Sequence, residues 1–187
     1  MYAPSEEKSE ESKDNFFEEL EQVFYHFTKY HMKILLGDFN AKVAREIIFK
    51  PAIGQESLHQ DSNDNGFRLL NFATSKNLVV KSTMFPHRNI HKYTWTSPDG
   101  KTHNQIDQVL IDRRCHSSVL DVRNFRGADC DTDHYLVIAK FRERIAVGKQ
   151  AAQRFDRQRF NLRKHNEPEV REQYQIEITT DLQLWRT

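Results

Sequence analysis

The sequence is short of cysteine and of long hydrophobic runs, and both shortages exclude classes of protein. Its two cysteines, Cys115 and Cys130, have neither C-x-x-C spacing nor the paired histidines of a zinc finger, and they are too few for a disulfide framework. No hydrophobic run approaches the roughly 20 residues that span a bilayer, and the N-terminus lacks the basic and then hydrophobic order of a signal peptide. We therefore expect no membrane segment and an intracellular protein, in the nucleus or the cytoplasm.

Hydrophobic residues are also scarce, at 37% of the 187 residues. Adding the six glycines does not reach the roughly 45–50% of a typical globular protein, so part of the chain is expected to lie outside the core. The formal net charge is +1, but residues 6–21 hold eight acidic side chains and residues 142–164 hold eight basic ones. The basic segment indicates either contact with phosphate groups or a solvated surface, and the pattern leaves both open.

Hydrophobic periodicity predicts helices early in the chain and strands late. Three- and four-residue repeats predict amphipathic helices over 12–31 and 66–76, each followed by a short hydrophobic run, typical of a buried strand, at 32–36 and 78–80. Turn signals separate the further strands that we expect at 93–96, 105–111, 119–124 and 135–141. This order predicts an α/β layered domain with a mixed sheet.

The chain divides into two parts by composition. Residues 1–145 contain the predicted helices and strands and form the expected domain. Residues 146–187 are rich in arginine and glutamine and have no strand alternation, so we expect a basic polar helix or linker tail.

A carboxylate and a carboxamide follow the first predicted strand, in the order Gly37, Asp38, Phe39 and Asn40. Because side chains two residues apart point the same way, Asp38 and Asn40 are expected on one side of the strand end. In α/β sheets this end is the usual ligand crevice, where carboxylate oxygens can bind a hard cation and an amide can donate to phosphate. An Asx turn that closes the strand is the alternative.

Two further polar groups stand at predicted strand ends. Asp107 begins a hydrophobic strand, where a charge is costly unless it is paired or functional. Asp133 and His134 precede the last strand, and a histidine beside a carboxylate can donate from one ring nitrogen while the other faces a substrate. We expect all three groups on different strands of one sheet, although His134 alone would more often be structural.

Aromatic and basic side chains occur together at 84–88 and 92–96. His87, Arg88 and Trp95 are candidate nucleic-acid contacts, because rings stack on bases and cations neutralise phosphates. The alternative for Trp95 is a place in the core or in the wall of a pocket, because alternating aromatic residues are also typical of strand cores. The segment 61–66 matches only the first half of a calcium loop, since Phe72 stands where the closing glutamate belongs; a turn capped by Asn63 or Asp64 before a helix is expected.

Six segments together resemble the endonuclease/exonuclease/phosphatase family, in its apurinic-endonuclease-like branch. They read Y-A-P-S at 2–5, G-D-F-N-A-K-V at 37–43, N-D-N-G at 63–66, T-W-T-S-P-D-G at 94–100, N-Q-I-D at 104–107 and D-T-D-H-Y-L-V at 131–137. More narrowly, the chain is similar to the endonuclease domain of RTE-class non-LTR retrotransposons and to host proteins that carry a domain of that origin. The resemblance covers about 140 residues and implies part of a four-layer α/β sandwich with mixed sheets.

The resemblance implies metal-dependent hydrolysis of DNA phosphodiesters that leaves a 3′-hydroxyl, with Mg²⁺ or Mn²⁺ offsetting charge on the phosphate. Asp38 would orient or deprotonate the attacking water, Asn40 would hold the phosphate, and Tyr2 would contact it through the hydroxyl. The remaining implied roles are His134 facing the phosphate, Asp107 fixing the orientation of His134, and Asp133 joining Asp38 at the metal.

The family places its principal metal-binding glutamate and an asparagine on strands before the Y-A-P motif, with which this sequence begins. No glutamate at 6–21 is expected to replace it, since periodicity turns these residues toward water. We therefore expect an incomplete metal site, impaired catalysis, and a sheet edge left open for a protein partner or self-association. The alternative is a non-catalytic module that binds nucleic acid or protein.

Overall fold

The computed structural model describes residues 1–28, 30–127 and 132–142, together with residues 168, 172, 175 and 176. The chain forms two compact units, Met1–Arg144 and Ile145–Thr187. Most of the predicted tail at 146–187 lies outside the described residues, so its form stays a prediction. Within the described part, no helix is both long enough and hydrophobic enough to cross a membrane.

Two helices occur where periodicity predicted them. Helix α1 covers Glu10–His26 and helix α2 covers Asp64–Ser75. Ser9 caps α1 by accepting a hydrogen bond from the Ser12 amide, and Asn63 caps α2 by accepting one from the Gly66 amide at 2.9 Å. The prediction that residues 61–66 form a turn and a helix cap is confirmed.

Three small antiparallel sheets carry the strands. The first has the order β1-β5-β2, the second joins β3 to β4, and the third joins β6 to β7. A parallel contact is added by the bridge between Tyr2 and Asp38. The strands are Ile34–Asp38 (β1), Leu78–Val80 (β2), Trp95–Thr96 (β3), His103–Asn104 (β4), Asp107–Asp112 (β5), Val119–Phe125 (β6) and Leu136–Phe141 (β7).

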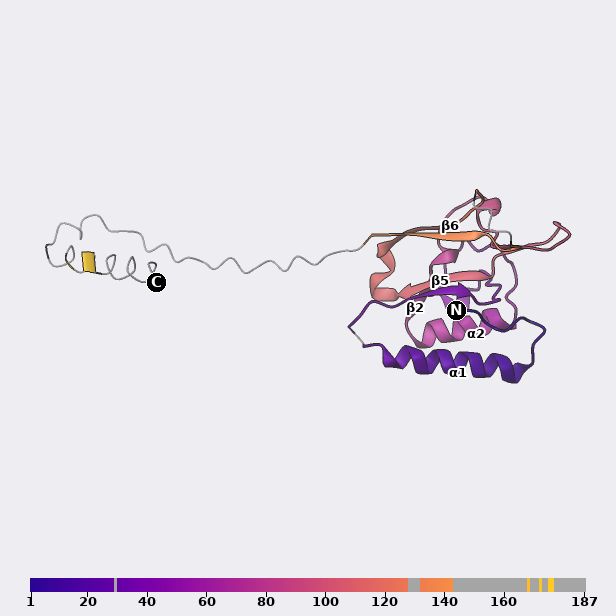
Figure 1. The fold of residues 1–187 in the computed structure, drawn as a ribbon, viewed down its shortest axis with the longest axis horizontal. Helices are drawn as coiled ribbons and strands as arrows, with labels where there is room; N and C mark the ends of the chain where they lie inside the picture. The colour runs from indigo at the N-terminus through magenta and orange to yellow at the C-terminus, as the bar shows by residue number, and fades with distance from the viewer. Residues whose placement is uncertain (29, 128–131, 143–167, 169–171, 173–174, 177–187) are drawn as a thin grey trace. The chain divides into compact units, whose positions relative to one another are not determined.

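Strand β5 separates two hydrophobic cores. Leu110 is fully buried in the core that the helices cover, whereas its neighbours Val109 and Ile111 pack in a second core with β6. This division follows from the alternation of side chains along a strand. Figure 1 shows the result as layers, with α1 and α2 below the sheet of β5 and β2, and β6 above it. The predicted α/β layered fold is confirmed.

Ion pairs and aromatic contacts join α1 to α2. Arg68 of α2 forms ion pairs with Glu10 and Asp14 of α1, and with Asp64 of its own helix. Phe72 packs against two phenylalanines of α1, with ring centroids 5.8 and 6.4 Å away. The sequence predicted that the acidic side of α1 faces water. In the structure, part of that side instead packs against α2 through Arg68.

The central position of β5 predicts a large cost for Leu110→Ala. Because Leu110 is 0% exposed, the substitution should lower the free energy of unfolding by about 2–5 kcal/mol, the range for a buried leucine. Leu36→Ala on the adjacent strand is the matched control. Because Leu36 is 52% exposed, this substitution should lower the free energy of unfolding by only about 0.5 kcal/mol. Urea unfolding measures the free energy of unfolding of both variants. Equal losses would contradict the burial of Leu110 in the core and the exposure of Leu36.

Candidate functional site

A cavity of about 550 Å³ opens beside the end of β1. Most of the residues that the sequence singled out meet there, although they come from distant segments of the chain. Its lining consists of Tyr2, Ser5, Glu6, Glu7, Asp38, Asn40, Lys42, Asn63, Trp95, Asn104, Ile106, Asp133 and His134.

Asp38 and Asp107 lie opposite each other, as register partners at the ends of β1 and β5. The Asp38 residue is only 9% exposed, and burial raises the pKa of its carboxyl above the ordinary value of 3.8. The negative charges of Asp107 and Asp133 act in the same direction, while a hydrogen bond from the Asn40 amide and the ring of His134 act against it. Asp38 is therefore a carboxyl group that takes up a proton more readily than one in water.

Asn40 turns the chain away from β1 with a φ of 48°, in the left-handed region that asparagine tolerates better than most residues. Its backbone N–H donates to Asp38 Oδ1 at 2.8 Å, as in an Asx turn. Its side-chain amide donates to the Ala3 carbonyl at 3.0 Å. The predicted proximity of Asp38 and Asn40 at one cavity is thus present, and the alternative Asx turn is present as well.

His134 lies between the two aspartates. Its Nδ1 is 3.1 Å from Asp107 Oδ2, and its Nε2 is 3.9 Å from Asp38 Oδ2. A hydrogen bond to Asp107 favours the proton on Nδ1 and leaves Nε2 toward the cavity. The expectation that all three groups share one sheet is wrong, because His134 forms a bridge with Trp95 of β3, in a separate sheet.

Trp95 holds the neighbouring carboxylate. Its indole Nε1 donates to Asp133 Oδ2 at 2.6 Å, and its ring lines the cavity. Trp95 therefore forms part of a pocket wall, which is one of the two positions that the sequence predicted for it. A nucleic acid bound in the same cavity would lie within its reach, which is the other.

The other two candidate nucleic-acid contacts lie outside this cavity. His87 Nε2 is 2.5 Å from Asp121 Oδ1 on β6, and Arg88 is exposed on the loop that follows. Tyr2 does reach the cavity, where its side chain is exposed and its backbone bridges to Asp38.

The sequence analysis missed Glu6 and Asn63 as parts of the site. The Asn63 side-chain amide donates to Glu6 Oε2 at 2.6 Å and to the Asn40 carbonyl at 2.9 Å. Glu6 is exposed, as predicted, but it also lines the cavity, which helical periodicity could not indicate because the helix begins only at Glu10. The N-D-N-G segment at 63–66 was the available signal for Asn63.

A divalent metal does not find a complete set of ligands here. Both predicted ligands, Asp38 and Asp133, line the cavity. Across residues 1–28, 30–127 and 132–142, however, no group of three or more histidine, cysteine or acidic side chains is close enough to hold a metal ion. Ca²⁺ and Mg²⁺ prefer several oxygen ligands, so these residues do not fit a preformed metal centre.

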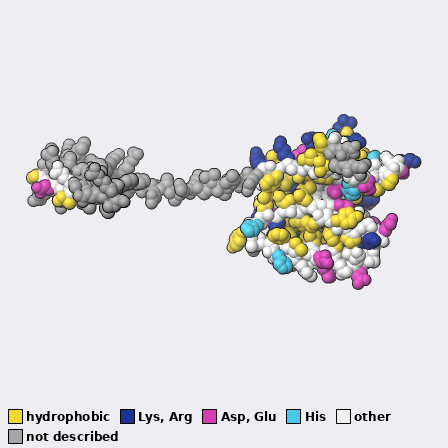
Figure 2. Space-filling model, in the orientation of Figure 1, with side chains coloured by type: hydrophobic (Ala, Val, Ile, Leu, Met, Phe, Trp, Pro, Cys, Tyr) yellow, Lys and Arg dark blue, Asp and Glu magenta, His cyan; other side chains and the backbone are white. Residues whose placement is uncertain are grey.

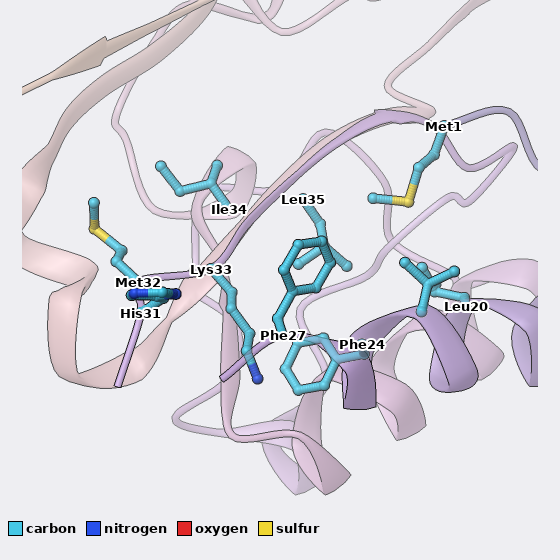
Figure 3. A pocket seen from close by; sticks show the side chains of 10 residues that line it. Met1, Leu20, Phe24, Phe27, His31, Met32, Lys33, Ile34 and Leu35 are labelled. Carbon is cyan, nitrogen blue, oxygen red and sulfur yellow. The ribbon is translucent and has the colours of Figure 1, made fainter. Parts of the chain in front are cut away.

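A second cavity, of about 310 Å³, lies between α1 and β1 and has a different chemistry (Figure 3). Its lining is mainly hydrophobic, with Leu20, Phe24 and Phe27 from or next to α1. Lys33 places its ammonium group 3.9 Å from the centre of the Phe24 ring, and His31 lies farther along the wall. The described residues that line this cavity include no acidic side chain, unlike those beside the end of β1.

Comparison with known proteins identifies relatives of the chain and of its fold. No family model matches the sequence. Craniofacial development protein 2 from Bos taurus is 37% identical over 148 residues, and the Tragulus javanicus protein of that name is 36% identical over the same length. The match covers 79% of this chain, which spans about a quarter of the length of these relatives.

The fold comparison extends the resemblance to solved structures. A 3′ phosphatase, NExo, from Neisseria bound to a product DNA hairpin and the 3′-5′ exonuclease NExo from Neisseria meningitidis each superpose with a TM-score of 0.52. Both are 24% identical to this chain, and the match covers 71% of it and 54% of each of them. The chain is therefore a relative of craniofacial development protein 2 and has a fold of the endonuclease/exonuclease/phosphatase type.

Proposed function

We propose that the chain is a retrotransposon-derived endonuclease-like domain that binds a DNA phosphate in the cavity of Asp38 and His134, and that hydrolyses phosphodiester bonds weakly by itself. The observation that carries this proposal is the position of His134 between Asp107 and Asp38. The Neisseria protein with a bound DNA hairpin supports DNA as the ligand. We also propose an intracellular setting, in the nucleus or the cytoplasm, where DNA is accessible.

The distances suit a water-mediated attack on phosphate. Because His134 Nε2 and Asp38 Oδ2 are 3.9 Å apart, an oxygen atom placed between them can form a hydrogen bond with each. Asp38 takes a proton from the attacking water, whose oxygen bonds to phosphorus while the bond to the 3′ oxygen breaks. The 3′ oxygen takes a proton from solvent, and the products are a 3′-hydroxyl and a 5′-phosphate.

The remaining side chains position the phosphate and its neighbours. His134 donates from Nδ1 to Asp107, which orients the ring with Nε2 toward the phosphate and the attacking water. Asn40 and the hydroxyl of Tyr2 contact the phosphate, and the Trp95 ring contacts the sugar or base beside it. His87 and Arg88, which lie away from the cavity, would contact DNA only at a distance from the cleaved bond.

The shortage of metal ligands makes the reaction slow. Mg²⁺ or Mn²⁺ is the cofactor that the family implies, and Asp38 and Asp133 are its candidate ligands. A hard cation held by two carboxylates lacks most of the oxygen ligands that it prefers, so its affinity is low. Catalysis is impaired because a cation contributes several kcal/mol of charge stabilisation in related chemistry.

A non-catalytic binding module is the second candidate, favoured by the hydrophobic surface along β1. Figure 2 shows hydrophobic side chains gathered between the levels of α1 and β6. Ile34, which lines the hydrophobic cavity of Figure 3, is 39% exposed, and Leu36 on the same strand is 52% exposed. On the edge away from β5, Met1 and Ala3 form hydrogen bonds with Leu36 and Asp38, and no described residue pairs with the backbone of Ile34 on that side. A protein partner or a second copy can pair there.

The hydrolytic function predicts slow nicking of supercoiled plasmid DNA and of DNA with an abasic site, in Mg²⁺ or Mn²⁺. Either Asp38→Ala or His134→Ala should lower the rate by roughly 10²–10⁴-fold, the usual contribution of a proton-transferring residue. His116→Ala, on an exposed histidine outside the cavity, is the matched control and should leave the rate unchanged. Cleavage that survives both cavity substitutions would contradict the proposed site, and a folded but inactive chain would favour the binding module.

The raised pKa of Asp38 predicts a stability that depends on pH. Because the folded chain holds the proton on Asp38 more tightly than the unfolded chain does, the protonated carboxyl stabilises the fold at low pH, and this contribution is lost as pH rises. Asp38→Asn should therefore raise the unfolding free energy at pH 7, with a gain that vanishes as pH falls below 3.8. Thermal unfolding across pH measures it, with the exposed Asp61→Asn as control.

The binding module predicts self-association through β1. Sedimentation velocity should detect a dimer whose population increases with protein concentration. The double substitution Ile34→Lys and Leu36→Lys should shift it to monomer, since buried charges at an edge strand oppose pairing. Ile47→Lys with Ile48→Lys is the control, because these side chains are 78% and 82% exposed on a different segment. A wild-type chain that stays monomeric at every concentration would exclude pairing between copies.

A further inference from the structure

Thr94 is a buried residue at which three segments of the site meet. It is 3% exposed and directly precedes Trp95 of β3. Its backbone N–H donates to the Asn104 carbonyl at 2.8 Å, and its own carbonyl accepts from the Tyr135 amide at 2.8 Å. Tyr135 is the residue after His134, so the backbone of Thr94 fixes the segment that carries this histidine.

The Thr94 hydroxyl performs the same task for Asp107. Oγ1 accepts hydrogen bonds from the amide of Ile106 at 2.9 Å and from the amide of Asp107 at 3.1 Å. It donates at 3.5 Å to the Asn104 carbonyl. A hydroxyl offers one donor and two acceptor positions, so Thr94 uses all three where β5 begins.

We propose that Thr94 is a positioning residue that sets the distance between Asp107 and His134. One residue holds the backbone on both sides of that pair, through its hydroxyl on the Asp107 side and its carbonyl on the His134 side. The pair itself is joined by the contact of 3.1 Å between Asp107 Oδ2 and His134 Nδ1. Its role in turnover rests on the proposed hydrolytic function, whereas its role in geometry does not.

The chemistry of the site explains why such a hold is needed. Asp38 and Asp107 are register partners, and Asp133 is a third carboxylate that lines the same cavity as Asp38. Like charges repel one another, so the start of β5 must be held against movement away from β1. The Thr94 hydroxyl opposes that movement because it binds the backbone amides of Ile106 and Asp107. Its removal would leave both amides without this partner. A shift of about 1 Å in a catalytic group can lower a rate by about 10²-fold.

The decisive comparison is Thr94→Val against Thr94→Ser. Valine keeps the shape and removes the hydroxyl, while serine keeps the hydroxyl. In the nicking assay we expect Thr94→Val to lower kcat by about 10²-fold with little change in KM for DNA, because the phosphate contacts stay in place. Thr94→Ser should stay within a few-fold of the wild type. Equal effects of the two substitutions would overturn the proposal.

A second measurement does not depend on turnover. The ¹⁵N shifts of the His134 ring report which nitrogen carries the proton, and we expect them to change in Thr94→Val and to be kept in Thr94→Ser. Unchanged ring shifts in Thr94→Val would overturn the positioning role. If the wild-type chain folds but does not cleave DNA, the hydrolytic function fails, while these shifts still decide the role of Thr94.

Thr96→Val is the matched control on the same strand. The Thr96 hydroxyl bonds to His103 and Tyr135 and has no contact with Asp107, so its loss should leave the His134 shifts unchanged. If Thr94→Val does not fold, Thr94→Cys replaces it, because a thiol is a weak hydrogen-bond acceptor. The expected order of rates is then wild type, Thr94→Ser and Thr94→Cys, and a cysteine variant as active as the serine variant would contradict the proposal.

Discussion

The antiparallel pairing of β5 with β1 is the contact on which the rest of the structure depends. Its register puts Asp107 opposite Asp38, and three steps farther along it buries Leu110 beside Leu35 under the helices. A slip of one residue would move every β5 side chain to the other face. The hydrophobic residues of β5 thus fix the position of the acidic pair, and the site cannot shift without loss of both cores.

The same pairing brings negative charges together, and the structure offsets this cost locally. Burial and the neighbouring carboxylates raise the pKa of Asp38, while the Asn40 amide and the His134 ring oppose that rise. Asp133 receives the indole N–H of Trp95. These contacts give Asp38 and Asp133 polar partners of their own, and the described residues do not form a group of three that could hold a metal ion.

Much of the fold and part of the site could be predicted from the sequence, because the signals are local. The periodicity of residues 12–31 and the hydrophobic run before Gly37 identified a helix and a strand, and the cap at Asn63 follows from turn chemistry. The position of His134 could not be derived in this way. Its bridge to Trp95 joins segments nearly forty residues apart, and strand patterns do not specify which strands pair. Glu6 was missed for a similar reason, since its partner Asn63 is 57 residues away.

The contrast between proton transfer and metal binding explains why identity and activity must be treated separately for this chain. Proton transfer needs a base, a histidine and a residue that orients it, and Asp38, His134 and Asp107 meet within 3.9 Å contacts. Metal binding needs several oxygen ligands around one point, a stricter requirement that the described residues do not meet. The cavity of Asp38 and His134 thus has the contacts that proton transfer needs, while its described residues lack the ligand set that a metal ion needs. In the proposed function, binding of DNA needs only the polar lining of the cavity, whereas efficient cleavage needs metal ligands as well.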